Sequence, residues 1–266
     1  GGAENYKKAF LEKLNEVYAS GEDLKISTDS LPVLKRGDGR NITGPRVLEQ
    51  KQPGLYTVSW HPVGGQPDLS VLCALSDAIQ SMEGVELRLA PDETVYVINL
   101  TAAEAERVLD ITENNTAKTE FEASVSCIGA AVCQVGVRDS QSLLRACVEA
   151  AQKAGLPADA LPKIHISGCP SSCGSHQAGS IGLVGHSKRV DGKMEPAFKL
   201  FVNGDSEEPG AHLGIEKCVL LETVIPEFFA ALGKRIAAAD STFDVWYPTH
   251  AEEFDTLAAE YAEKTQ

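Results

Sequence analysis

The spacing of apolar residues along this chain changes from a helical to a strand period near residue 55. Residues 4–18 carry their larger apolar side chains on one helical stripe, which ends before Gly21. The stripe consists of Tyr6, Phe10, Leu14, Val17 and Tyr18. Residues 27–54 are rich in Gly, Pro, Arg and Lys and show no period. We therefore expect residues 1–50 to form a helix followed by an extended, weakly structured arm.

Residues 51–112 show the pattern of one small β-α-β-β-α unit. Alternating apolar positions predict strands, Asp68 and Gly84 bracket a helical stripe that includes Leu69 and Leu72, and Thr101 with Glu104 forms a capping box. The predicted elements are a strand over 55–60, a helix over 68–84, strands over 85–90 and 94–100, and a helix over 101–110. This order is most of a ferredoxin-like split βαβ unit.

A polar stretch, residues 111–120, is predicted to link this half-repeat to a second domain over residues 120–266. Strands and helices are interleaved in the second domain, which indicates an α/β layer. The predicted strands are 122–127, 163–167, 180–185 and 197–204, and the predicted helices are 139–155, 223–238 and 249–263. The fold class predicted for the whole chain is α+β, with a ferredoxin-like half-repeat followed by an α/β domain.

Composition narrows the possible partners. The 266 residues have a formal net charge of −14, whereas nucleic-acid binding needs a basic footprint. No apolar run approaches the roughly 18 residues of a membrane span, and the first residues lack the pattern of a signal peptide. We expect a cytoplasmic chain that binds neither nucleic acid nor a membrane. The two opening glycines indicate a tag remnant or a processing end, and so a fragment.

Seven cysteines, an odd number, argue against a disulfide framework in a chain of this kind. Cys127 and Cys133 are separated by five residues, and Cys169 and Cys173 by three. Each pair directly follows a predicted strand. If those strands are neighbours in one sheet, all four thiols converge at its carboxyl edge, where α/β sheets commonly bind ligands.

Four thiolates suit either zinc or an iron–sulfur cluster. The gaps are wider than those of a zinc knuckle, and nearby glycines let backbone N–H groups approach an anionic cluster. Spacing therefore favours a cluster, while zinc and unrelated structural thiols stay open as alternatives. The remaining cysteines, Cys73, Cys147 and Cys218, lie on apolar stripes and are expected in the core.

The sequence around the cysteines resembles that of a known protein family. The stretches SVSCIGAAVC and SGCPSSCG followed by HQAGSIGLVG are similar to the cofactor site of the nitrite and sulfite reductase haemoproteins, which contain sirohaem and a 4Fe–4S cluster. Upstream, QKQPGLYTVSWHPVGGQPD and VELRLAPDETVYVINL resemble the half-repeat that precedes that site. The resemblance covers roughly residues 40–240.

This resemblance implies that Cys127, Cys133, Cys169 and Cys173 hold the cluster and that the sulfur of Cys173 bridges to the sirohaem iron. Residues 120–266 would then be the sirohaem- and cluster-binding domain. Electrons from a donor protein or reductase would pass through the cluster and Cys173 for the six-electron reduction of nitrite or sulfite. Which of the two anions is reduced and the identity of the donor stay open.

The chain departs from the family pattern at two positions and in length. Ser171 stands where the family often has Asn, and Glu93 stands at a Gln position of the half-repeat. Family members typically have two pseudo-symmetric halves, and this chain resembles the C-terminal one alone. Residues proposed as partners for the sirohaem carboxylates are Arg46, Arg88, Arg138, His176 and Lys188.

Residues that bind the substrate anion come largely from the other half, so no catalytic residue is assigned in this chain. We expect little or no turnover without the missing N-terminal half or a partner subunit. Two alternatives stay open: an iron–sulfur electron-transfer module without sirohaem, and an inactive scaffold that is metal-free or holds zinc. Oligomeric state stays open as well.

Overall fold

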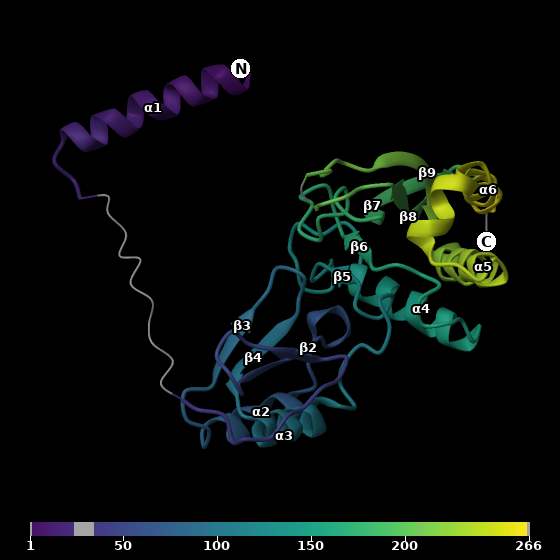
Figure 1. Cartoon of the computed structure of the whole chain (residues 1–266). Coiled ribbons are helices and arrows are strands. Elements are labelled where there is room, and N and C mark those ends of the chain that lie inside the picture. The colour runs from purple at the N-terminus through teal and green to yellow at the C-terminus, as the bar shows by residue number, and fades with distance from the viewer. Residues whose placement is uncertain (1, 24–34, 208, 265–266) are drawn as a thin grey trace. The chain divides into compact units, whose positions relative to one another are not determined.

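A computed structural model describes residues 2–23, 35–207 and 209–264. The chain divides into two compact units, Gly1–Leu34 and Lys35–Gln266 (Figure 1). The first unit contains helix α1 (Ala3–Ala19), which confirms the helix predicted from the apolar stripe. Within this helix, all of which is described, no residue is buried. The stripe is exposed, with Tyr6 at 75% and Tyr18 at 59%.

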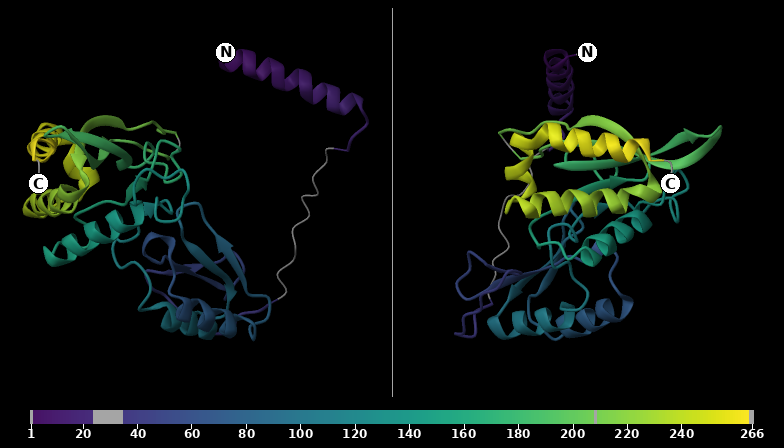
Figure 2. Two further views of the ribbon diagram at one scale, coloured as in Figure 1. Left: turned by 180° about the vertical axis from the view of Figure 1, so that it is seen from behind. Right: turned by 90° about the vertical axis from the view of Figure 1, so that its right-hand side faces the viewer.

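The second unit begins with an antiparallel sheet in the order β1-β2-β4-β3. Helices α2 and α3 lie together along one face of this sheet (Figures 1 and 2). The elements are β1 (Val47–Glu49), β2 (Tyr56–Trp60), α2 (Leu69–Ile79), β3 (Glu86–Leu89), β4 (Val95–Leu100) and α3 (Ala102–Thr112). The β-α-β-β-α order predicted from the sequence is confirmed. A short 3-10 turn, η1 (Val63–Gly65), follows β2.

The fourth strand of this ferredoxin-like sheet comes from the arm that precedes β2. Strand β1 pairs antiparallel with β2, with Val47 opposite Val58. The arm is tied to α3 as well, because Lys35 forms an ion pair with Glu104. The expectation of an extended, weakly structured arm is therefore wrong at Val47–Glu49, which pair with β2, whereas residues 35–46 contain no helix or strand. Residues 24–34 of the arm lie outside the described residues.

The second sheet is mixed, in the order β5-β6-β7-β8-β9. Strands β5, β6 and β7 are parallel, whereas β7–β8 and β8–β9 are antiparallel. The strands are β5 (Val125–Ser126), β6 (Ile164–Ser167), β7 (Ile181–Val190), β8 (Lys193–Val202) and β9 (Ile215–Leu221). The sequence interpretation did not assign β9, because IEKCVLL has too few residues to separate a strand from a helical stripe.

Three helices pack against this sheet, and α5 and α6 lie side by side beside it (Figure 2). They are α4 (Ser140–Lys153), α5 (Ile225–Ala238) and α6 (Phe243–Glu263). Helix α6 begins six residues before the predicted start at 249. Pro248 lies inside the helix, and a proline in a sequence usually indicates a helix start or end. The apolar side chains form two separate cores, one around each sheet. The α+β fold class is confirmed, while the predicted domain boundaries stay predictions.

Helix starts follow the expected side-chain capping in two of three cases. Thr101 accepts a hydrogen bond from the Glu104 N–H, and the Glu104 carboxylate accepts one from the Thr101 N–H, completing the capping box of α3. Asp139 accepts from the Ser142 N–H at the start of α4. Asp68 occupies the cap position of α2 but makes no side-chain capping bond.

Candidate functional site

The two cysteine pairs follow neighbouring parallel strands. Strand β5 pairs with β6 in register, with Val125 opposite His165 and Ser126 opposite Ile166. Cys127 directly follows β5, and Cys169 follows β6 after a single glycine. The condition on which the sequence argument depended is therefore confirmed. Because the strands are parallel, both cysteine loops leave the sheet at the same carboxyl edge.

Backbone hydrogen bonds join the two cysteine loops to each other. The N–H groups of Val137 and Arg138, at the end of the first loop, both donate to the carbonyl of Gly168, at 3.1 and 2.9 Å. In return, the Gly168 N–H donates to Sγ of Cys127 at 3.0 Å. Backbone N–H groups are among the donors that hydrogen-bond the sulfurs of metal-ligating cysteines. The two loops are therefore hydrogen-bonded to each other directly at Cys127.

Glycine is required at the point where the loops touch. A Cβ atom on Gly168 would lie 2.6 Å from the Arg138 carbonyl oxygen, and one on Gly174 would lie 2.2 Å from the Ile166 carbonyl oxygen. Both contacts are with backbone that cannot move aside. The glycines of the second loop thus allow close packing against backbone carbonyls, and their role in bringing N–H groups to a cluster stays a prediction.

Ser171 supplies hydrogen bonds to the third cysteine. Donation from the hydroxyl and from the backbone N–H of Ser171 lowers the pKa of the Cys169 thiol. A serine at this position can therefore stabilise a thiolate although it lacks an amide side chain. Cys169 is buried, Cys127 and Cys133 are half-buried, and Cys173 is exposed. The last cysteine thus presents its sulfur outward.

His176 is a buried residue that is hydrogen-bonded within the second cysteine loop. Its side chain is 2% exposed, its Nδ1 lies 3.0 Å from Oγ of Ser167, and its ring packs on Phe201. Burial lowers the pKa of His176, which favours the neutral ring. A neutral, buried ring is a weak partner for an external carboxylate, so its role as a cofactor contact stays a prediction.

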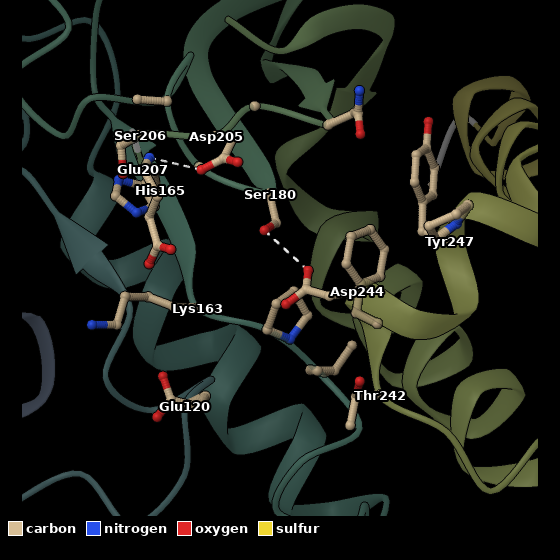
Figure 3. A pocket seen from close by; sticks show the side chains of 18 of the residues that line it. Glu120, Lys163, His165, Ser180, Asp205, Ser206, Glu207, Thr242, Asp244 and Tyr247 are labelled. Carbon is tan, nitrogen blue, oxygen red and sulfur yellow. Dashed lines mark hydrogen bonds between the residues drawn. The ribbon is translucent and has the colours of Figure 1, made fainter. Parts of the chain in front are cut away.

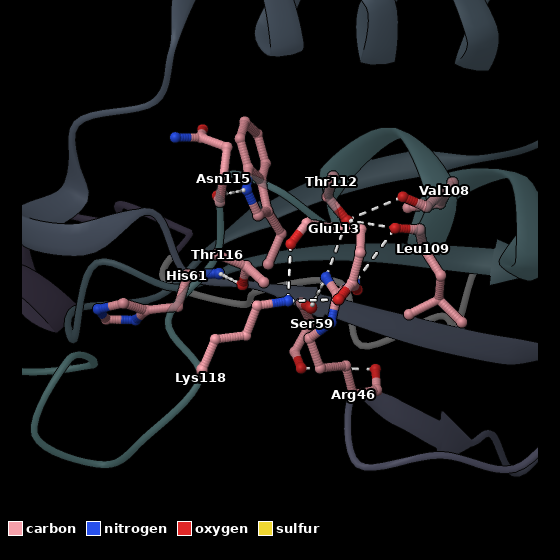
Figure 4. Close-up of polar contacts among 11 residues, drawn as sticks. Arg46, Ser59, His61, Val108, Leu109, Thr112, Glu113, Asn115, Thr116 and Lys118 are labelled. Carbon is pink, nitrogen blue, oxygen red and sulfur yellow. Dashed lines mark hydrogen bonds and ion pairs between the residues drawn. The ribbon is translucent and has the colours of Figure 1, made fainter. Parts of the chain in front are cut away.

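The basic residues proposed for the cofactor carboxylates are all engaged within the protein. Arg46 donates to the Thr112 hydroxyl at 2.8 Å and to the Leu109 carbonyl at 3.2 Å, and so closes the end of α3 (Figure 4). Arg138 donates to the His186 carbonyl at 2.7 Å. Arg88 forms an ion pair with Glu86, and Lys188 donates to the Ala262 carbonyl. Their contacts with sirohaem therefore stay predictions.

A cavity of about 470 Å³ opens beside Cys127. Its wall is largely apolar and combines the ferredoxin-like sheet with the first cysteine loop. Lining residues include Trp60, Leu72, Leu87, Leu89, Cys127 and Ile128. Leu72 is 40% exposed and Leu69 is 75% exposed, so the expectation that their stripe of α2 faces the core is wrong at both positions. An apolar cavity next to a thiol can hold the apolar face of a flat cofactor.

A second hollow, of about 650 Å³, lies beside β6 and α6 and contains no cysteine among its described lining residues (Figure 3). Its carboxylates outnumber its one lysine, and Ser180 donates to Asp244 at 3.2 Å. The carboxylates are Glu120, Asp159, Asp205, Glu207 and Asp244. Like charges repel, so this hollow disfavours small anions and carboxylate-rich cofactors.

The three remaining cysteines differ in burial. Cys147 is fully buried and confirms the core prediction. Cys218 is half-buried, and burial raises the pKa of its thiol to about 11. Cys73 is exposed, so its predicted core position is wrong. The apolar neighbours of Cys73 in the sequence belong to other faces of α2, which buries only Leu75 and Ala78.

Residues 2–23, 35–207 and 209–264 contain no group of three or more Cys, His, Asp or Glu side chains placed to hold a single metal ion. Zinc draws its sulfurs to about 2.3 Å around one point. The four cysteines of a cluster each bind a different iron, so their sulfurs are spread farther apart. Four cysteines on two hydrogen-bonded loops, with N–H or O–H donors directed at Cys127 and Cys169, are chemically suited to a cluster, and their role as its ligands stays a prediction.

Comparison with known proteins places this chain among relatives that act on nitrite. It is 29% identical over 212 residues to a ferredoxin–nitrite reductase of Synechococcus elongatus, covering 77% of this chain and 40% of the relative. It is 31% identical over 183 residues to the chloroplastic ferredoxin–nitrite reductase of Zea mays, covering 65% of this chain and 31% of the relative. No protein-family model matches the chain. The family resemblance read from the cysteine motifs is confirmed.

A solved structure shares the fold. The NirA protein of Mycobacterium tuberculosis superposes with a TM-score of 0.59 over 84% of this chain and 42% of that chain, at 19% identity. The chain thus spans about two fifths or less of the length of these relatives. No helix in the described residues is long and apolar enough to cross a membrane.

Proposed function

We propose that this chain, a relative of the ferredoxin–nitrite reductases, is the cofactor-binding part of a nitrite or sulfite reductase. One observation carries the proposal: Cys127 and Cys169 follow adjacent parallel strands on loops that are hydrogen-bonded to each other. Cys127, Cys133, Cys169 and Cys173 would hold a 4Fe–4S cluster. The exposed Cys173 would also ligate the iron of sirohaem.

The chain's own residues would prepare the site for these groups. The hydrogen bonds from Ser171 lower the pKa of the Cys169 thiol and so favour its thiolate form before any metal arrives, and the Gly168 N–H donates to Sγ of Cys127. The apolar cavity beside Cys127 would exclude water from one side of the site. When bound, the cluster and sirohaem would supply the electron-carrying chemistry of the six-electron reduction.

Nitrite or sulfite, an electron-donor protein such as ferredoxin or a reductase, and the remaining part of the enzyme are the partners that this proposal requires. The chain spans only part of its relatives' length, and its candidate basic residues already bond to its own carboxylates and carbonyls. We therefore propose that a further polypeptide segment supplies cations for the substrate anion. Turnover by this chain alone is expected to be weak or absent.

A second candidate is an iron–sulfur electron-transfer module without sirohaem. It is favoured by the internal bonding of Arg46, Arg88, Arg138 and Lys188, since sirohaem carries several carboxylates that need cationic partners. The four-cysteine site would be the same in both candidates.

An absorption spectrum of the anaerobically purified and reconstituted chain separates the two. Strong bands near the red end of the visible beside a broad cluster shoulder are expected for the reductase part, and a shoulder alone for the electron-transfer module. Colourless protein with stoichiometric zinc contradicts both.

The ligand assignment is tested by a matched pair of cysteine variants. Cys173→Ser is expected to lose at least half of the bound iron and any sirohaem together. Cys147→Ser changes a buried thiol within α4, outside both cysteine loops, and is expected to keep iron content within the error of the wild type. Iron and sulfide analysis with electron paramagnetic resonance of the reduced protein gives the readout. Equal iron loss in both variants contradicts the assignment.

A further inference from the structure

The backbone N–H and the backbone carbonyl of Ser126, the residue before Cys127, are each hydrogen-bonded to a long side chain from a different element. Its N–H donates to Oε1 of Glu93 at 3.0 Å. Its carbonyl accepts from Nε2 of Gln141 at 2.8 Å. Glu93 lies in the turn between β3 and β4, and Gln141 lies in the first turn of α4.

Strand β5 is the edge of its sheet, so the outward-facing N–H of Ser126 has no neighbouring strand to accept it. Glu93 fills this role from the ferredoxin-like sheet, which makes the contact a link between the two sheets of the second unit. Ser126 is 2% exposed, so water cannot replace the bond. An unpaired buried N–H is costly, and the bond to Glu93 therefore fixes where β5 ends.

The backbone of Glu93 is held in a conformation that aims its side chain. Its φ is 70°, in the left-handed region, which is uncommon outside glycine. The turn is closed by the Ala90 N–H donating to the Thr94 carbonyl at 2.9 Å and by the Glu93 N–H donating to the Ala90 carbonyl at 3.2 Å. Strained backbone at a position whose side chain makes a specific contact indicates a functional constraint.

Gln141 reaches past Ser126 toward the cysteine itself. Its Nε2 also donates to the Gly64 carbonyl at 2.8 Å and lies 3.3 Å from the Cys127 carbonyl oxygen. Gln141 is 3% exposed, and its Oε1, like Oε2 of Glu93, is buried without a hydrogen-bond partner in the described residues. Glu93 is therefore oriented by its bond to the Ser126 N–H, and Gln141 by its bonds to the carbonyls of Gly64 and Ser126.

The glycine pair Gly64–Gly65 leaves room for both side chains. A Cβ on Gly64 would lie 2.4 Å from Oε1 of Gln141, and one on Gly65 would lie 3.0 Å from Cβ of Glu93. Both glycines have a positive φ of 65°. The turn after β2 is thus shaped around the two side chains.

We propose that Glu93 and Gln141 are positioning residues that clamp the Ser126–Cys127 backbone and so set the direction of the Cys127 thiol. The clamp makes the geometry of the first cysteine loop depend on the ferredoxin-like sheet. That Cys127 is a cluster ligand rests on the proposed function, whereas the clamp concerns the protein before any metal binds.

The clamp is tested in the metal-free full chain by two local measurements. Glu93→Ala is expected to raise the hydrogen-exchange rate of the Ser126 amide at least tenfold. It is also expected to raise the alkylation rate of Cys127 by iodoacetamide at least threefold, measured for each cysteine by mass spectrometry. The exposed Cys73 serves as the internal standard and should react at an unchanged rate.

Conservative and matched variants separate positioning from general loosening. Glu93→Gln keeps an acceptor oxygen in place and is expected to retain wild-type exchange at Ser126. Gln141→Ala is expected to raise Cys127 alkylation as Glu93→Ala does. Glu86→Ala, which removes an exposed carboxylate from β3, should change neither measurement. If Glu93→Ala leaves exchange and alkylation at wild-type rates while remaining folded by circular dichroism, the clamp proposal is overturned.

The same variants are then reconstituted with iron and sulfide. The clamp predicts a broader electron paramagnetic resonance signal or lower iron content in Glu93→Ala than in Glu93→Gln. Failure of the wild-type chain to bind iron would overturn the proposed function and leave the exchange and alkylation results to judge the clamp. Normal iron binding in the wild type with unchanged exchange in Glu93→Ala would overturn the clamp alone.

Discussion

Single residues at this site have roles that differ from the ones their sequence context indicates. Glu93 stands at a Gln position of the family pattern. In the structure its carboxylate accepts a hydrogen bond from the Ser126 N–H, and Glu93 lines the apolar cavity beside Cys127. Ser171, the other departure, keeps a donor on Cys169. At both positions the side chain makes a hydrogen bond to the backbone or sulfur of a cysteine loop, which the sequence alone does not show.

Glu93 should make stability depend on pH. Burial is the main cause that raises its pKa to about 7, from an ordinary 4.5. Because the pKa of Glu93 is raised in the folded state, its favourable contribution to the free energy of unfolding is complete below about pH 4.5 and is lost as pH rises to about 7. Glu93→Gln has no carboxyl to ionise, so its stability does not decline in this way. We expect the melting temperature of Glu93→Gln, minus that of the wild type, to increase between pH 5 and pH 8.

Thermal unfolding of the metal-free proteins, followed by circular dichroism, measures this difference. Glu86→Gln, which alters an exposed carboxylate on β3, is measured alongside as the comparison variant. A difference for Glu93→Gln that is flat with pH would show that the Glu93 carboxyl titrates as it does in the unfolded chain.

Among the elements, those with strong local chemistry were predictable. Thr101 with Glu104, Asp139, and the alternating LYTVSW stretch each led to the element that the structure contains. Strand β1 was missed because three residues in a Pro- and Gly-rich arm become a strand only by pairing with β2. The sequence could not show that β5 and β6 are neighbours in the sheet, because strand order depends on contacts between distant segments.

The capping box of α3 offers a test at the element scale. Thr101→Ala removes the hydroxyl that accepts from the Glu104 N–H. A lost cap of this kind costs about 1 kcal/mol, so the free energy of unfolding in urea should fall by that amount. Thr256→Ala, an exposed mid-helix position in α6, should change it by less than about 0.5 kcal/mol. A Thr101→Ala variant as stable as Thr256→Ala would mean that α3 is held by packing alone.

For the whole molecule, the sequence sufficed to predict the α+β class and most strands and helices in their order along the chain, whereas the four-cysteine site stays a prediction. It could not show that Arg46, Arg138 and Lys188 donate to backbone carbonyls within the protein, because the partner of a basic side chain depends on the three-dimensional fold. The Glu93–Gln141 clamp was equally hidden. It depends on a left-handed residue in one turn meeting a helix start forty-eight positions later in the chain.

The division into two units predicts how the chain tolerates truncation. Helix α1 buries none of its described residues, so its removal takes no side chain out of either core. Deletion of residues 1–34 should therefore leave the melting temperature of Lys35–Gln266 within about 2 °C of the full chain, which is roughly what half to one kcal/mol produces at this size. Differential scanning calorimetry measures it.

Deletion of residues 1–49 is the control, because it also removes β1 and the bonds of Arg46 to α3, and it should lower the melting temperature clearly. Equal losses for the two deletions would mean that residues 1–34 stabilise the second unit, whereas loss with the longer deletion alone would assign the ordering of the arm to β1 and Arg46.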